Sequence, residues 1–228
     1  MNSLRKAGGI AALYEALAYV IGMVGFLVVI NLGDATDPVE KMNAIAENQA
    51  ALTTLMLIVY VVWGATLVVL TLSLHQRLKG EKYALAQVAT AFGLIWSVLV
   101  IASGMIYNVG LETVVKLAES NPAEAVTVWT AIESIFNGLG GGVEVVGGIW
   151  VVLLSIAALR HGGLPRPFSI FGILVGAAGL VTVIPALGEI GGAVFGLTQI
   201  VWFTWLGITL LRQPAPTTLE AMTPALNS

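Results

Sequence analysis

Residues 126–160 read VTVWTAIESIFNGLGGGVEVVGGIWVVLLSIAALR, and this stretch decides the fold class of the chain. It is mostly apolar and rich in glycine. A helix needs about 20 apolar residues to cross a hydrocarbon core of roughly 30 Å. At about 1.5 Å per residue, the run from Val126 to Leu159 would measure about 51 Å, which is too long for one straight crossing. We therefore predict an outer interfacial helix at 124–137 and a membrane span at 138–159.

Two carboxylates in this stretch, Glu133 and Glu144, lie eleven residues apart. At about 100° per residue this separation is about three turns plus 20°, so a continuous helix would project both side chains from one face. Asn137 falls on the same stripe, as do Gly141 and Gly148. Such a stripe is costly to expose to lipid and is expected to face protein or water. Glu144, Glu133 and Asn137 are therefore candidate ligand-binding residues.

The composition of the chain is that of a membrane protein. Of its 228 residues, 57% are hydrophobic and 10% are charged, whereas a soluble domain carries about 25% charged residues. The mean hydropathy is +0.92. The apolar runs are continuous and do not alternate over about ten residues as barrel strands do, so they indicate helices. We predict an all-α polytopic membrane protein with six transmembrane helices.

The six helices are expected within one transmembrane domain, residues 1–212. Their predicted spans are about 8–32, 51–75, 84–108, 138–159, 167–187 and 190–211. The first apolar run is longer than the 7–15-residue core of a signal peptide, so we expect a retained helix. Residues 213–228 have the low hydrophobicity of a disordered cytoplasmic tail.

The basic residues predict the orientation of these helices. In a six-helix layout, eight of the ten basic residues lie on one side of the membrane, and only Lys41 and Lys116 lie on the other. Basic residues are enriched on the cytoplasmic side of membrane proteins. We therefore expect both termini in the cytoplasm and the protein in the cell (inner) membrane. The eight basic residues of the cytoplasmic side are Arg5, Lys6, Arg77, Lys79, Lys82, Arg160, Arg166 and Arg212.

Two further carboxylates are candidate binding groups. By helical rise, Glu15 lies roughly 13–15 Å beyond Arg5. A charged side chain at such depth costs about 2.5–3.5 kcal/mol on insertion scales, which makes it a functional hypothesis. Glu189 lies in the expected tight outer turn at 185–189, where acids near the outer face could attract cations. The structural alternatives are a hydrogen-bonded acid that ties helices together for Glu15 and Glu144, and a solvated loop acid for Glu189.

Several classes of chemistry have no support in the sequence. The chain has no cysteine, which excludes disulfides, thiolate catalysis and cysteine metal sites. Its two histidines, His75 and His161, come without the further ligands that metal sites use. A net charge of −3 gives no basic field for nucleic acid. We expect no catalytic residue, no metal and no cofactor.

The start of the chain resembles a known family. Residues 4–14, LRKAGGIAALY, and residues 19–22, YVIG, are similar to the opening of the DUF4386 family of bacterial integral membrane proteins. The length and helix count are similar too. Glu15 follows Tyr14 where the family pattern has an apolar residue, so the resemblance implies no shared role for Glu15. The family has no assigned activity, and the resemblance implies a fold without implying a catalytic residue.

Two functional hypotheses follow from the sequence. The first is a non-enzymatic membrane protein whose polar interior, centred on Glu144, binds or passes a small cation, a proton or a small amphiphile. The alternative is an accessory or scaffolding subunit whose glycine faces, with Gly176 and Gly192 among them, pack against partner helices of a larger complex or of a second copy.

Overall fold

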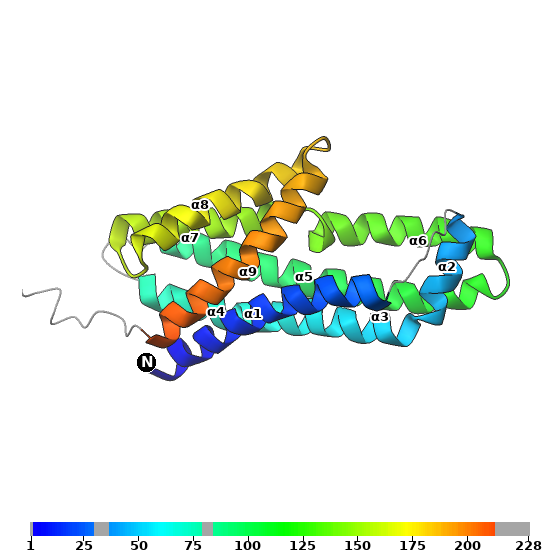
Figure 1. Cartoon of the computed structure of the whole chain (residues 1–228), viewed down its shortest axis with the longest axis horizontal. Helices are drawn as coiled ribbons and strands as arrows, with labels where there is room; N and C mark the ends of the chain where they lie inside the picture. Colours follow the sequence, from blue (N-terminus) through cyan, green and yellow to red (C-terminus); the bar gives the residue numbers. More distant parts are fainter. Residues whose placement is uncertain (1, 30–36, 79–83, 213–228) are drawn as a thin grey trace, which may run out of the picture.

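The computed structural model describes residues 2–29, 37–78 and 84–212. In these residues the chain forms helices joined by short turns, with no strand (Figure 1). The predicted tail at 213–228 lies outside the described residues. In chain order the elements are α1 (Asn2–Val29), α2 (Pro38–Glu47), α3 (Gln49–Met56), the π-helical turn η1 (Leu57–Val62), α4 (Trp63–Leu78), α5 (Ala84–Ala118), α6 (Pro122–Phe136), the π-helical turn η2 (Asn137–Gly141), α7 (Val145–His161), α8 (Arg166–Leu180), the 3-10 turn η3 (Val181–Val183) and α9 (Gly188–Arg212).

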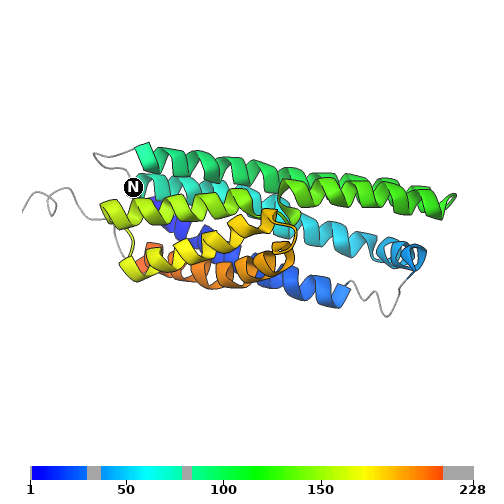
Figure 2. The ribbon, with the colours of Figure 1, turned by 90° about the horizontal axis from the view of Figure 1, so that it is seen from above.

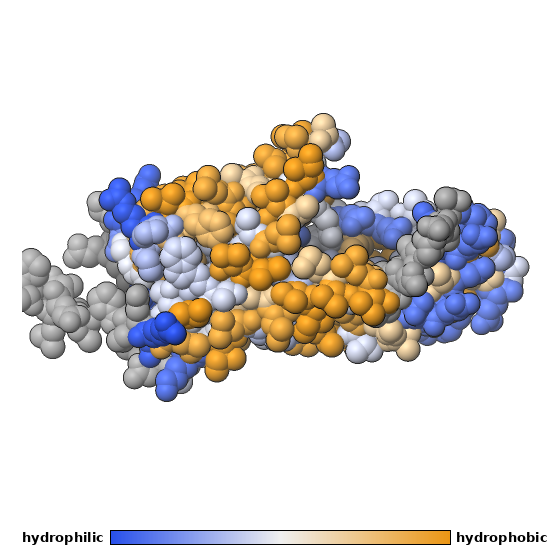
Figure 3. Space-filling model, viewed as in Figure 1, coloured by the Kyte–Doolittle hydropathy of each residue, from blue (hydrophilic) through white to orange (hydrophobic). Residues whose placement is uncertain are grey.

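Six helical segments in the described residues are long and apolar enough to cross a membrane, which confirms the predicted fold class. They are Ser3–Val28, Gln49–Leu78, Ala84–Ala118, Pro122–His161, Arg166–Val183 and Gly188–Arg212. Figure 3 shows hydrophobic side chains over the middle of the molecule and hydrophilic side chains toward both ends. This distribution is the one expected of a protein whose middle lies in hydrocarbon.

The two ends of the long bundle differ. One end, here called the basic end, holds the start of α1, the end of α9 and the turn between α7 and α8 (Figures 1 and 2). There the Arg5 Nη1 donates to the Leu210 carbonyl, 3.0 Å away. The opposite end, here called the far end, consists of α2, α3, the last turns of α5, and α6. The described N- and C-terminal helix ends therefore share one end of the molecule.

The far end has a small hydrophobic core of its own. The helix expected at 84–108 continues to Ala118, because Leu111 and Val114 are fully buried and extend its apolar face. These residues cluster with Tyr107 and with Trp129 of α6. The described part of the segment between the first two predicted spans contains α2. This helix begins at Pro38 and is capped by Asp37, whose Oδ1 accepts from the Val39 amide.

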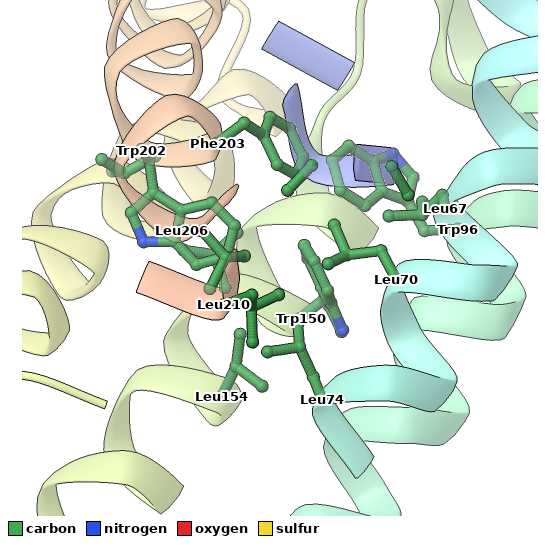
Figure 4. Packing of buried hydrophobic residues seen from close by; sticks show 14 of the residues in the cluster. Leu67, Leu70, Leu74, Trp96, Trp150, Leu154, Trp202, Phe203, Leu206 and Leu210 are labelled. Atoms are coloured by element: carbon green, nitrogen blue, oxygen red, sulfur yellow. The ribbon is translucent and has the colours of Figure 1, made fainter. Parts of the chain in front are cut away.

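The main core is built from aromatic rings of α5, α7 and α9 (Figure 4). The ring centroids of Trp96 and Trp150 lie 5.6 Å apart, and those of Trp150 and Trp202 also lie 5.6 Å apart. Leucines of α4, α7 and α9, including Leu70 and Leu154, surround these rings. Stacked and edge-to-face rings fix relative helix positions more specifically than aliphatic side chains do. This core positions the helices that surround the site described below.

Glycines bring α7 and α8 into backbone contact. A Cβ atom at Gly176 would lie 2.7 Å from the Gly148 carbonyl oxygen, and one at Gly179 would lie 3.0 Å from the Glu144 carbonyl oxygen. Close approach of this kind is how helices associate in lipid. The face of α8 that carries Gly176 and Gly179 is therefore already packed against α7 of the same chain.

The helix that the sequence placed at 138–159 begins at Val145, and a break separates it from α6. Gly140 adopts a φ of 138°, which only glycine adopts readily. The Asn137 carbonyl accepts from the amides of Gly142 and Val143 in place of a regular helical pattern. Glu133 and Glu144 therefore do not share a helix face, because the continuous helix assumed in that prediction does not form.

The helix expected at 167–187 also ends early. α8 stops at Leu180 and passes through η3 to Ile184, whose backbone is extended (φ −87°, ψ 113°). Pro185 follows, and the residue before a proline is disfavoured in the helical conformation. The turn that results leads into α9 at Gly188 and brings Thr182 beside the start of α7.

Candidate functional site

A pocket of about 380 Å³ opens between α1 and α9. Its other walls come from η1 with the start of α4, from α5, and from the junction of η2 and α7. α1 and α9 touch near the basic end, where a Cβ atom at Gly207 would lie 2.9 Å from the Gly9 carbonyl oxygen. The two helices diverge away from that end (Figure 1), and the pocket occupies the space between them.

Small residues on α1 and α9 leave room for the pocket. A Cβ atom built at Gly196 would approach nothing closer than the Tyr19 ring at 3.8 Å, and one at Gly192 nothing closer than 4.0 Å. At Gly22 the nearest atom is a Val59 methyl group at 3.6 Å. All three glycines line the pocket. Larger side chains at these positions would occupy the space that is now open.

Aromatic rings form the inner walls of the pocket. The lining includes Tyr19 of α1, Tyr60 of η1, Trp63 at the start of α4, and Trp96 of α5. The π-helical turn at η1 changes the helical register just before Trp63, and such turns are frequent at functional sites. The Tyr14 hydroxyl donates to the Ile58 carbonyl of this turn at 2.7 Å, so α1 holds η1 in place.

Glu144 closes the pocket at the junction with α7. Its backbone amide donates to the Thr182 Oγ1 at 2.8 Å, and the Thr182 hydroxyl donates to the Gly179 carbonyl at 2.7 Å. The carboxylate does not cap its own helix. Its Oε2 is buried and has no hydrogen-bond partner among the described residues. Tyr19 and Tyr60 lie close enough to interact with it electrostatically.

Glu15 lies near the pocket but does not line it. The side chain is fully buried, and its Oε1 forms a 2.7 Å hydrogen bond with the Thr66 hydroxyl of α4. Its Oε2 is buried with no partner in the described part of the chain. Tyr19, one turn further along α1, interacts electrostatically with both Glu15 and Glu144. Glu15 thus ties α1 to α4 close to the aromatic wall.

The other predicted site residues lie away from the pocket. Glu133 and Asn137 are exposed on the far-end side of the helix break, and neither lines the pocket. Glu189 is exposed in the first turn of α9, also outside the lining. Of the five candidates, the structure brings Glu144 to the pocket and Glu15 to its immediate surroundings.

The family model named Domain of unknown function (DUF4386) matches residues 10–212, which is most of the chain. The chain belongs to the DUF4386 family. Neither the curated proteins nor the solved structures contain a match to it. The function of this DUF4386 protein must therefore be inferred from the pocket itself.

The aromatic residues that line the pocket of this DUF4386 protein were not among the site residues predicted from the sequence. Trp63 and Trp96 are nearly fully buried and also line the pocket. A single sequence gives no signal for this lining, because its rings come from α1, η1, α4 and α5. Across the described ranges, no three histidine, aspartate or glutamate side chains form a metal-binding group.

Proposed function

We propose that this protein is a non-enzymatic membrane protein that binds a small amphiphile in the pocket between α1 and α9. The observation that carries the proposal is a partnerless, buried carboxylate oxygen of Glu144 in a pocket that is otherwise mostly apolar. Ligand sites of 300–1,000 Å³ are typically apolar with a few placed polar groups. A carboxylate and a few hydroxyls in a mostly apolar pocket suit a molecule with a polar head and an apolar body.

The mouth of the pocket supports loading from the membrane. Met23 of α1 is 44% exposed and Leu197 of α9 is 55% exposed, and both line the pocket. In a bilayer these positions face hydrocarbon, so an apolar ligand would reach the pocket without crossing water. We also infer that the basic end faces the cytoplasm, because Arg160, Arg166 and Arg212 gather there. The pocket would then lie toward the outer side.

The scaffolding alternative draws less support from the contacts. Gly176, which was expected to meet a partner helix, contacts α7 of the same chain. Gly192 lines the pocket. The exposed side chains of α1 and α9, such as Leu27 and Val201, are large and aliphatic, whereas helix–helix interfaces in membranes are enriched in small residues.

A pocket-filling variant tests the proposed function. The protein would be extracted with its surrounding lipid, and bound small molecules would be identified by mass spectrometry. We expect an amphiphile enriched over bulk lipid in the wild type and lost in Gly196→Leu, whose side chain would enter the pocket. Gly138→Leu is the matched control, because a Cβ atom there meets nothing within 4 Å and the residue does not line the pocket. Equal enrichment in both variants would contradict the proposal.

A further inference from the structure

We propose that the pocket selects lipophilic organic cations, meaning ligands in which a positively charged nitrogen or phosphorus centre carries apolar groups. This inference rests on the proposed function and specifies the chemical class of its ligand. Three features of the pocket support it: the sign of its charge, its aromatic walls and its mouth.

Any charge that the described lining of the pocket carries is negative. Among the described lining residues, Glu144 is the only carboxylate, and none of them is a lysine, an arginine or a histidine. The buried Glu144 Oε2 has no hydrogen-bond donor from the described protein atoms. A buried carboxylate is stabilised by a paired positive charge or by a donor. A cationic ligand supplies that charge, whereas an anionic head group would meet a carboxylate with no basic residue to offset it.

The aromatic walls suit the same ligand. Tyr19 and Trp63 rings meet with their centroids 6.0 Å apart at 80°, and Trp63 and Trp96 rings meet at 4.9 Å and 75°. Trp63 and Trp96 are nearly fully buried and yet line the pocket, so a ligand would meet only the parts of these rings that face it. Cations are attracted to the faces of tryptophan and tyrosine rings, and several rings together recognise quaternary ammonium groups. Tyr60 adds a fourth ring to the lining.

A hydrated metal ion fits this pocket less well than an organic cation does. Hard cations such as Ca²⁺ and Mg²⁺ take about six or more oxygen ligands. The lining offers the Glu144 carboxylate and the hydroxyls of Tyr19 and Tyr60 among mostly apolar side chains. The apolar mouth at Met23 and Leu197 would also favour a cation that partitions into hydrocarbon. An organic cation whose charge is surrounded by apolar groups needs few oxygen ligands and can also pass through an apolar mouth.

The test measures binding of tetraphenylphosphonium to the full-length protein in lipid nanodiscs. Equilibrium dialysis with the radiolabelled cation would be corrected with empty nanodiscs. We expect saturable binding near one cation per protein that weakens by at least about tenfold in Glu144→Gln. Glu119→Gln removes an exposed far-end carboxylate and should bind as the wild type does. Circular dichroism and gel filtration would establish that each variant is folded.

Two further ligands separate charge from size. Tetraphenylborate has nearly the shape of tetraphenylphosphonium with the opposite charge, and it should show no saturable binding when it is dialysed alone. Neutral triphenylphosphine oxide, which has one phenyl group fewer, should compete weakly with the cation. Equal competition by the neutral molecule, or unchanged binding in Glu144→Gln, would overturn the cation inference. Absence of saturable cation binding would overturn it as well. The amphiphile proposal is judged separately, by the bound molecules that Gly196→Leu loses, so the two failures are distinguishable.

Discussion

The backbone amide of Glu144 donates a hydrogen bond to the hydroxyl of Thr182, 2.8 Å away and 38 residues further along the chain. This bond joins the first residue before α7 to the turn that follows α8. The first amides of a helix lack partners within the helix and are usually satisfied by a side-chain oxygen close in sequence. Here the oxygen comes from a different helix, so the position of Glu144 depends on the packing of α8.

Replacing Thr182 with valine should loosen the start of α7. Loss of a capping oxygen costs about 0.5–2 kcal/mol of the free energy of unfolding, and we expect amide exchange at 144–148 to accelerate. Thr182→Ser keeps the hydroxyl and should restore both properties. Thr198→Val is a suitable control, since the Thr198 hydroxyl bonds to carbonyls of its own helix. Wild-type exchange rates in Thr182→Val would contradict the role of this bond.

Glu15 and Thr66 should be energetically coupled. Thr66→Val leaves the buried Glu15 Oε1 without its partner, at a cost of about 1–3 kcal/mol in the free energy of unfolding. In a Glu15→Leu background the same change should cost less, because no carboxylate remains to be satisfied. A double-mutant cycle measured by unfolding in bicelles gives the coupling energy. Additive effects of the two changes would show that the 2.7 Å contact contributes nothing.

Substitution by alanine should change the free energy of unfolding by different amounts at two glycines, one in α8 and one in α9. A Cβ atom at Gly176 would lie 2.7 Å from the Gly148 carbonyl oxygen, so Gly176→Ala should lower the free energy of unfolding by about 1–3 kcal/mol. Gly196→Ala meets nothing closer than 3.8 Å and should remain within about 0.5 kcal/mol of the wild type. Unfolding measured in the same bicelles would test both, and similar losses at the two positions would contradict the close packing of α7 and α8.

Gly140 should not tolerate a side chain, because of its backbone and not because of crowding. Its φ of 138° is strained for any residue with a Cβ atom, although the nearest atom to such a Cβ lies 3.7 Å away. Gly140→Ala is therefore expected to lose about 1–3 kcal/mol of the free energy of unfolding. Gly138→Ala, two residues earlier with open space around it, should be neutral or slightly stabilising. A harmless Gly140→Ala would mean that the break between α6 and α7 relaxes easily.

The orientation can be measured by labelling, because the chain has no cysteine. Thr127→Cys places an exposed thiol on α6 at the far end, and His161→Cys places one at the basic end. A membrane-impermeant maleimide added to intact cells should label the Thr127→Cys variant and leave the His161→Cys variant unlabelled, while permeabilised cells should label both. The reverse pattern would place the basic end outside, contrary to the distribution of arginines.

The membrane-spanning fold could be predicted because the length of each apolar run shows directly whether a helix can cross the hydrocarbon core. Each of the six spans is an apolar run bounded by charge or proline, and these features act over a few residues. The extension of α5 to Ala118 was not predicted, because Glu112 and Lys116 interrupt the apolar run beyond residue 108. In the structure they form an exposed ion pair of 2.7 Å on the outward face of a helix whose inward face, including Leu111, is apolar.

The site was only partly predictable, because it depends on contacts between distant segments. Glu144 could be selected as a carboxylate in an apolar stretch. The separation of Glu144 from Glu133 could not be predicted, because the start of α7 is held by Thr182, which is far away in sequence. The aromatic wall likewise combines residues of α1, η1, α4 and α5, and a single sequence shows no pattern that joins them.

The span made by α8 and η3 contains 18 residues, from Arg166 to Val183, whereas α5 contains 35. At about 1.5 Å per residue this short span reaches about 27 Å, slightly less than a typical hydrocarbon thickness of about 30 Å. Lipid beside α8 must therefore compress, at a cost of a fraction of a kcal/mol for each ångström of mismatch. We expect the protein to favour thin bilayers, and head groups beside the turn before α9 to sit deeper than their neighbours elsewhere in the leaflet.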